Sequence, residues 1–196
     1  MSLMLLRLLI TGLFLFASVS ASAHEASGVA DGFNSGFLHP LLGWDHVAAM
    51  IAVGLWGAIL GNPALWVLPV VFPVVMAIGG AMGVIAIPLP GVELGIAISA
   101  LVLGLMVVFA IRPPLWIAAV LVGAFAIFHG HAHGTELPHA ANSLAYSMGF
   151  VICTGLLHLC GIAFGSLQRW PAGQVLVRAG GAAIALAGVS FLLRAI

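Results

Sequence analysis

Hydrophobic residues fill most of the chain in long runs, which are separated by short polar, glycine or proline breaks. Six of these runs approach the roughly 20 residues that an α-helix needs to cross a bilayer. They cover residues 37–60, 65–87, 92–111, 115–133, 144–167 and 175–195. The polar, glycine-rich stretch before them, residues 25–36, predicts a short lead-in rather than a domain. The pattern therefore predicts an all-α integral membrane protein whose six transmembrane helices form a compact bundle.

The first 23 residues are typical of a cleavable secretory signal peptide. Arg7 supplies the positive charge, an apolar core follows, and Ala21-Ser22-Ala23 matches an A-x-A cleavage site. Cleavage would leave residues 24–196 as one transmembrane domain and would expose His24 as its first residue. The free α-amine and the imidazole of His24 would then form a chelating pair for a divalent transition metal. An uncleaved first helix, with His24 as an ordinary loop residue, is the alternative.

Composition agrees with a membrane protein. Of the 196 residues, 63% are hydrophobic and only 5% are charged, whereas soluble domains carry about 25% charged residues. Arginines and acidic residues balance at five each, so we expect no basic surface for a nucleic acid. The sequence contains no Walker A motif, so no ATPase subunit or ATP-driven step is implied. The eight histidines outnumber either charged class, and their positions direct the search for a function.

The predicted orientation follows from the signal peptide and the arginines. A secretory signal would place the mature N-terminus in the periplasm of a bacterium, with the first, third and fifth helices running inward from there. Arg112, Arg169 and Arg178 would then lie on the cytoplasmic side of the inner membrane, and only Arg194 opposes this positive-inside bias. Both histidine-rich stretches would lie on the same outer side, where they could meet.

The first histidine-rich stretch is His39-Pro40-Leu41-Leu42-Gly43-Trp44-Asp45-His46. Ionisable side chains at membrane depth are costly and indicate function by default. On one continuous helix, His39 and His46 would face the same way, with Pro40 in the first turn. Met50 would lie one turn beyond His46. Asp45 would either bind a metal from the side or orient a neighbouring imidazole. The alternative is a polar pair that caps the helix near the interface.

The second histidine-rich stretch, residues 129–139, contains four histidines within eleven residues. His129, His133 and Glu136 would share one face if the fourth helix extends that far. Two imidazoles and a carboxylate are a good partial ligand set for Ni²⁺, Co²⁺, Zn²⁺ or Cu²⁺. His131 lies off this face and His139 follows a proline, so both are weaker candidates. Because two glycines weaken the helix here, a solvated loop that buffers metal is the alternative.

His158 lies near the middle of the fifth predicted helix. A lone histidine there is often a hydrogen-bonded core residue. With two histidine clusters outside it, His158 could instead be a relay or exit ligand. We expect the other helices to serve as a structural scaffold. Glycines four residues apart, such as Gly79 with Gly83 and Gly161 with Gly165, let helices approach closely.

These motifs carry a family resemblance. The run His39-Pro40-x-x-Gly43-x-Asp45-His46-x-x-x-Met50-x-x-Val53-Gly54 resembles the signature of the HupE/UreJ proteins, small membrane proteins encoded with hydrogenase and urease systems. The similarity extends to two further motifs, His129-Gly130-x-x-His133-Gly134-x-Glu136-Leu137-Pro138 and Leu157-His158-x-x-Gly161. What the resemblance implies is a permease for nickel or cobalt.

The resemblance thus implies a secondary or facilitated transporter, not an enzyme, that supplies metal for hydrogenase or urease maturation. Its expected partners are a divalent metal ion as substrate and the lipid bilayer, with no prosthetic group. The expected metal ligands are His39, Asp45, His46, His129, His133 and Glu136, with His24 as first contact, His158 as an inner station, and His131, His139 and Met50 as weaker candidates. Two other hypotheses stay open: a metal sensor or delivery protein without transport, and an intramembrane zinc hydrolase.

Overall fold

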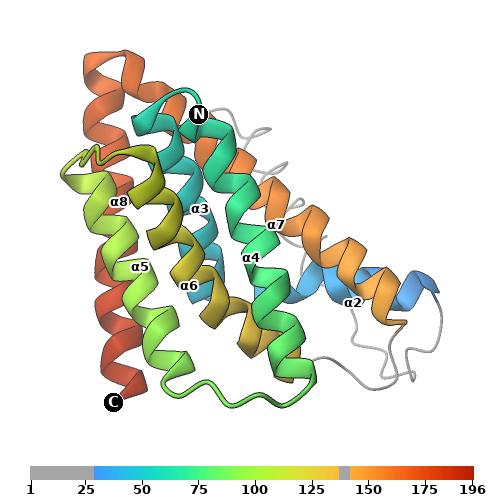
Figure 1. Cartoon of the computed structure of the whole chain (residues 1–196). Coiled ribbons are helices and arrows are strands. Elements are labelled where there is room, and N and C mark those ends of the chain that lie inside the picture. Colours follow the sequence, from blue (N-terminus) through green and yellow to red (C-terminus); the bar gives the residue numbers. More distant parts are fainter. Residues whose placement is uncertain (1–28, 137–141) are drawn as a thin grey trace, which may run out of the picture.

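The computed structural model of the chain describes residues 29–136 and 142–196, which are almost entirely helical (Figure 1). In chain order the elements are α2 (Val29–Leu42), α3 (Trp44–Leu60), α4 (Ala64–Val84), α5 (Val92–Val108), α6 (Leu115–Thr135), α7 (Ser143–Gly165), the 3-10 turn η1 (Ser166–Arg169) and α8 (Pro171–Ala195). The predicted signal peptide, His24 and His139 lie outside the described residues.

The described helices are those of a multi-pass membrane protein. By length and composition, four of them can cross a membrane: α4, α6, α7 with its η1 extension, and α8. If α2 and α3 are counted together as one bent span, they meet the same criterion, and the number of candidate spans rises to five. The remaining apolar helix, α5, is shorter at 17 residues. The all-α membrane fold is thus confirmed, whereas the six predicted spans are matched by four or five helices of sufficient length.

The single helix predicted over residues 37–60 is wrong. The chain forms two helices there, α2 and α3, which meet at Gly43 with a bend of 82°. Gly43 has an extended backbone (φ −99°, ψ 103°) that interrupts the helix. Pro40 lies in the last turn of α2 and not in a first turn, so its missing N–H removes a hydrogen bond close to the bend. As a result, α2 runs nearly across the bundle (Figure 1).

The glycine-rich lead-in predicted before this helix is also wrong from residue 29 onward, because it forms the first half of α2. Its glycines serve packing: a side chain on Gly36 would overlap the backbone carbonyl of Tyr146, and one on Gly149 would overlap that of Phe33. The small residues therefore allow α2 and α7 to lie in backbone contact. A glycine-rich composition that is typical of a loop therefore occurs here in a tightly packed helix.

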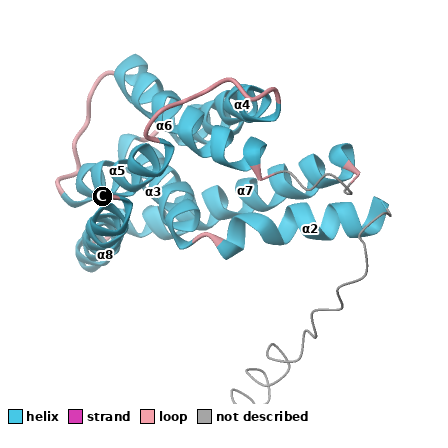
Figure 2. Ribbon diagram, turned by 90° about the horizontal axis from the view of Figure 1, so that it is seen from below, coloured by secondary structure: helices cyan, strands magenta, loops and turns pink. Residues whose placement is uncertain are grey.

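The other helices pack in pairs around α3. Viewed from below, α4 lies beside α6, α5 beside α8, and α7 beside α2 (Figure 2). In the middle, α3 contacts α4, α5, α7 and α8 and is buried along most of its length. The predicted glycine contacts are present, since Gly79 and Gly83 of α4 lie directly against α6, and Gly161 lies against α3. Backbone contact between α4 and α6 holds the histidines of α6 in a fixed position.

Candidate metal centre

The two histidine-rich stretches meet at one end of the bundle. The imidazole rings of His46 on α3 and His133 on α6 are 4.3 Å apart between centroids, and those of His46 and His129 are 4.6 Å apart. From α2, the ring of His39 lies 4.9 Å from that of His133. We call His39, His46, His129 and His133 the histidine cluster. Its members come from three helices, and each ring lies within reach of at least one other.

The bend at Gly43 produces this arrangement. His39 and His46 do not share a face of one helix, as the continuous-helix prediction required. They approach His133 instead from two helices that diverge by 82°. A Cβ atom on residue 43 would lie 2.9 Å from His46 Nδ1 and 3.0 Å from Asp45 Oδ1. The glycine therefore gives the chain both its turn and the space for these two side chains.

Asp45 orients His46. Its Oδ1 atom accepts hydrogen bonds from the backbone N–H of His46, at 2.8 Å, and from the Nδ1 atom of the same residue, at 2.7 Å. A proton on Nδ1 leaves Nε2 with a lone pair, and this Nε2 is buried without a hydrogen-bond partner among the described residues. The geometry corresponds to the second of the two roles considered for Asp45, in which a carboxylate sets the tautomer of a metal-binding imidazole.

A serine orients His129 in a comparable way. The hydroxyl of Ser99 on α5 donates to the carbonyl of Ile96 at 2.6 Å, so its oxygen can accept from His129 Nε2, 2.8 Å away. The lone pair of His129 then lies on Nδ1, which is buried with no partner in the described part of the chain. Sequence analysis missed Ser99. A serine within an otherwise apolar helix was the only available signal.

His133 occupies the centre of the cluster, and both of its ring nitrogens are buried and unpaired within the described ranges. Glu136 lies nearby at the surface, 59% exposed, with its Oε2 atom 3.3 Å from His39 Nε2. Ligand atoms of His39, His133 and Glu136 all fall within 4.8 Å of one another. These three residues can therefore hold a cation at the mouth of the cluster, where the carboxylate is accessible to water.

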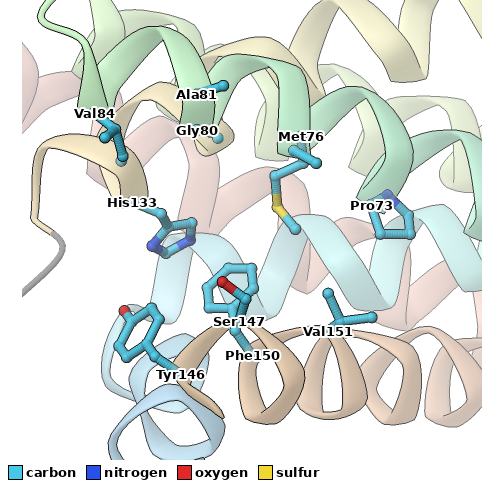
Figure 3. Close-up of a pocket in the computed structure, with 13 residues that line it drawn as sticks. Pro73, Met76, Gly80, Ala81, Val84, His133, Tyr146, Ser147, Phe150 and Val151 are labelled. Atoms are coloured by element: carbon cyan, nitrogen blue, oxygen red, sulfur yellow. The ribbon is translucent and has the colours of Figure 1, made fainter. Parts of the chain in front are cut away.

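A cleft of about 230 Å³ opens beside His133, between α4, α6 and α7 (Figure 3). His133 points from α6 toward Tyr146 and Phe150 of α7, and its ring lies 4.4 Å from that of Phe150. The walls are mostly apolar, and Met76 and Pro73 of α4 form the opposite side. The cleft thus gives the central histidine room for a ligand or for movement. Sequence analysis had not singled out its aromatic residues.

His158 lies deeper in the bundle and is 1% exposed. Neither of its ring nitrogens has a hydrogen-bond partner among residues 29–136 and 142–196. The ring of Phe72 on α4 separates it from the cluster, with centroid distances of 5.5 Å to His129 and 5.4 Å to His158. Imidazoles therefore continue inward from the cluster, interrupted by one buried aromatic ring that sequence analysis did not single out.

The two weaker candidates among the described residues have other contacts. His131 points away from it, and its Nε2 atom bonds to the backbone carbonyl of Ile87 at 2.8 Å. Met50 is fully buried and packs in the hydrophobic core. The hydrogen bond of His131 therefore holds the connection between α4 and α5 in place, and Met50 contributes to packing of the core.

The donor set of the cluster suits a borderline divalent cation. Imidazole nitrogens and one or two carboxylate oxygens are typical ligands of nickel, cobalt, zinc and copper. A buried polar atom without a hydrogen bond costs about 1–3 kcal/mol, and His46, His129 and His133 carry such nitrogens on neighbouring rings. A bound metal ion would remove this cost. In the described part of the chain, only His39, His133 and Glu136 bring their ligand atoms within 4.8 Å of one another.

Comparison with known proteins agrees with the sequence motifs. Residues 12–191 match the model of the family described as HupE / UreJ protein. The chain is also similar to Protein HupE of Rhizobium leguminosarum bv. viciae, with 46% identity over 172 residues, which cover 87% of this chain and 90% of that protein. No solved structure matches the chain.

Proposed function

The chain belongs to the HupE/UreJ family, and from this premise we propose that it is a secondary or facilitated transporter that imports Ni²⁺, or Co²⁺, through the histidine cluster. The metal would supply hydrogenase or urease maturation, as the family resemblance implies. The observation that supports the proposal is the group of buried, unpaired imidazole nitrogens on His46, His129 and His133. These nitrogens serve no structural partner within the described residues and are the type of donor that a nickel ion prefers.

The proposed route begins at the exposed carboxylate of Glu136 and its partner His39. From there the ion passes to His133, which adjoins both the mouth and the rest of the cluster. His158 is the next station inward, behind Phe72. Successive sites that bind an ion and also release it are what conduction requires. Neutral imidazoles suit this role because they bind a cation without the full attraction of an all-carboxylate site.

The proposed driving force is the membrane potential. We place the cluster on the periplasmic side of the inner membrane, so that a divalent ion moves inward down the potential. A potential of 100 mV contributes about 4.6 kcal/mol to the inward movement of two charges. This is sufficient for accumulation of roughly a thousandfold. No nucleotide-binding motif is then needed to drive import.

Uptake of ⁶³Ni²⁺ into proteoliposomes under an imposed inside-negative potential tests this proposal. We expect saturable uptake by the wild type, competition by unlabelled Co²⁺, and loss of uptake in His133→Ala. The matched control is His131→Ala, which removes a histidine of the same helix that faces away from the cluster and should retain uptake. Tight nickel binding without flux would contradict the permease and favour the sensor or delivery protein. Permanent binding of one zinc ion, with peptide hydrolysis, would favour the hydrolase.

A further inference from the structure

Charge is segregated between the two ends of the bundle. At the end with the histidine cluster lie all the described carboxylate side chains, Asp31, Asp45, Glu93 and Glu136, together with Arg194. The other end carries the remaining described arginines, Arg112, Arg169 and Arg178. In the described ranges no carboxylate forms an ion pair with any of these three. Their charges are therefore free to attract an anion from outside the chain.

Two of these arginines line a cavity of about 260 Å³. It lies between the end of α3, the connection from α5 to α6, η1 and the first turns of α8. Arg112, Arg178, Gln168 and Gln174 provide its polar lining. The amide of Gln168 donates to the carbonyl of Ala58 at the end of α3, so one wall of the cavity is fixed to the bundle. The cavity is therefore lined by two guanidinium groups and two side-chain amides.

Exposed tryptophans indicate the depth of this cavity in the membrane. Trp66 at the start of α4, Trp116 at the start of α6 and Trp170 just before α8 are 56%, 68% and 51% exposed. Tryptophan is enriched where the hydrocarbon core meets the headgroups. The guanidinium of Arg169 lies over the ring of Trp170, 4.5 Å from its centroid. Because these residues belong to the same end of the bundle as the cavity, we place its arginines near the level of lipid phosphates.

We propose that this cavity binds the phosphate of an anionic phospholipid, with Arg112 and Arg178 as the phosphate ligands. Guanidinium groups bind phosphate oxygens in pairs of parallel hydrogen bonds. Basic pockets between transmembrane helices on the cytoplasmic side are suited to anionic headgroups. Free inorganic phosphate offers the same chemistry, but the surrounding tryptophans favour a ligand held in the membrane. The site lies at the opposite end of the bundle from the histidine cluster and does not depend on metal transport.

Thermal unfolding of the purified full-length protein in a zwitterionic detergent tests this site, because a ligand that binds the folded state raises Tm. Short-chain phosphatidylglycerol, short-chain phosphatidylcholine and inorganic phosphate are titrated separately. We expect phosphatidylglycerol alone to raise the Tm of the wild type. In the double variant Arg112→Gln/Arg178→Gln, its apparent affinity should fall at least tenfold. The matched control is Arg194→Gln, which removes an arginine at the other end and should respond like the wild type.

Two outcomes would overturn the proposal. An equal response of the double variant and the wild type would exclude the arginines as ligands. A Tm shift of the same size with inorganic phosphate would replace the lipid by a soluble anion. If the double variant does not fold, Arg112→Lys and Arg178→Lys keep the charge while removing paired hydrogen bonding, and retention of phosphatidylglycerol in native mass spectrometry then gives the readout. Each lysine variant should retain less lipid than the wild type, and equal retention would contradict the site.

Discussion

Replacing Asp45 with asparagine tests how the histidine cluster is held ready for a metal. The carboxylate accepts from both the backbone N–H and the ring Nδ1 of His46, at 2.8 and 2.7 Å. Asparagine has nearly the same shape and can keep the bond to the backbone through its oxygen. It loses the negative charge, however, which holds the proton on Nδ1 and makes Nε2 a better donor. The change therefore affects the electronic state of His46 more than the fold.

The size of the effect follows from this indirect role. Loss of a carboxylate that orients a metal-binding histidine typically weakens metal affinity by about 10- to 100-fold, which corresponds to about 1.4–2.8 kcal/mol. A carboxylate that itself bound the metal would cost far more, because the charge would be lost from the ion's own ligand shell. The expected result for Asp45→Asn is thus a weakened nickel site that still binds.

Equilibrium dialysis of nickel against the purified protein measures this affinity, with ⁶³Ni²⁺ uptake as a second readout. Asp31→Asn is the matched control, because Asp31 lies in the first turn of α2 while His39 lies in the last turn. It should bind nickel like the wild type. Unchanged affinity in Asp45→Asn would refute the orienting role, and complete loss of binding in a folded variant would show that Asp45 is a direct ligand.

Two further predictions concern His131 and the packing of the helices. His131→Ala should leave nickel affinity within about twofold but lower Tm, since it removes the bond to the Ile87 carbonyl; a loss of affinity would place it in the site. Gly130→Ala should destabilise the protein by about 1–3 kcal/mol in thermal unfolding, because a methyl group would overlap the Met76 carbonyl. Gly155→Ala, where space is open, should have little effect.

Long apolar runs and their breaks were sufficient to predict the helical membrane fold and most helix positions. Helix direction also followed, because each span reverses the chain, and this placed both histidine stretches at one end. The turn at Gly43 could not be predicted in this way. Nothing in the local pattern distinguishes a glycine that bends a span from one that packs inside it, and Gly36 illustrates the second case.

The ligand-type residues of the candidate site could be proposed from the sequence because histidines are rare in apolar helices, but their neighbours in the fold could not. Ser99 orients His129 from another helix, and Phe72 separates His129 from His158. A lone serine or phenylalanine in an apolar run carries no sign of what it faces. The role of each depends on helix rotation and packing, which only the folded arrangement specifies.

Nickel K-edge X-ray absorption of the loaded protein tests the central claim most directly, because it counts the imidazoles bound to the ion. The claim is that residues from both histidine stretches share one metal. We expect the spectrum of the wild type to show several imidazole ligands, and His46→Ala and His133→Ala each to lose imidazole scattering or the ion itself. A spectrum that is unchanged in either variant, or a shell of oxygen ligands alone, would contradict a shared histidine site.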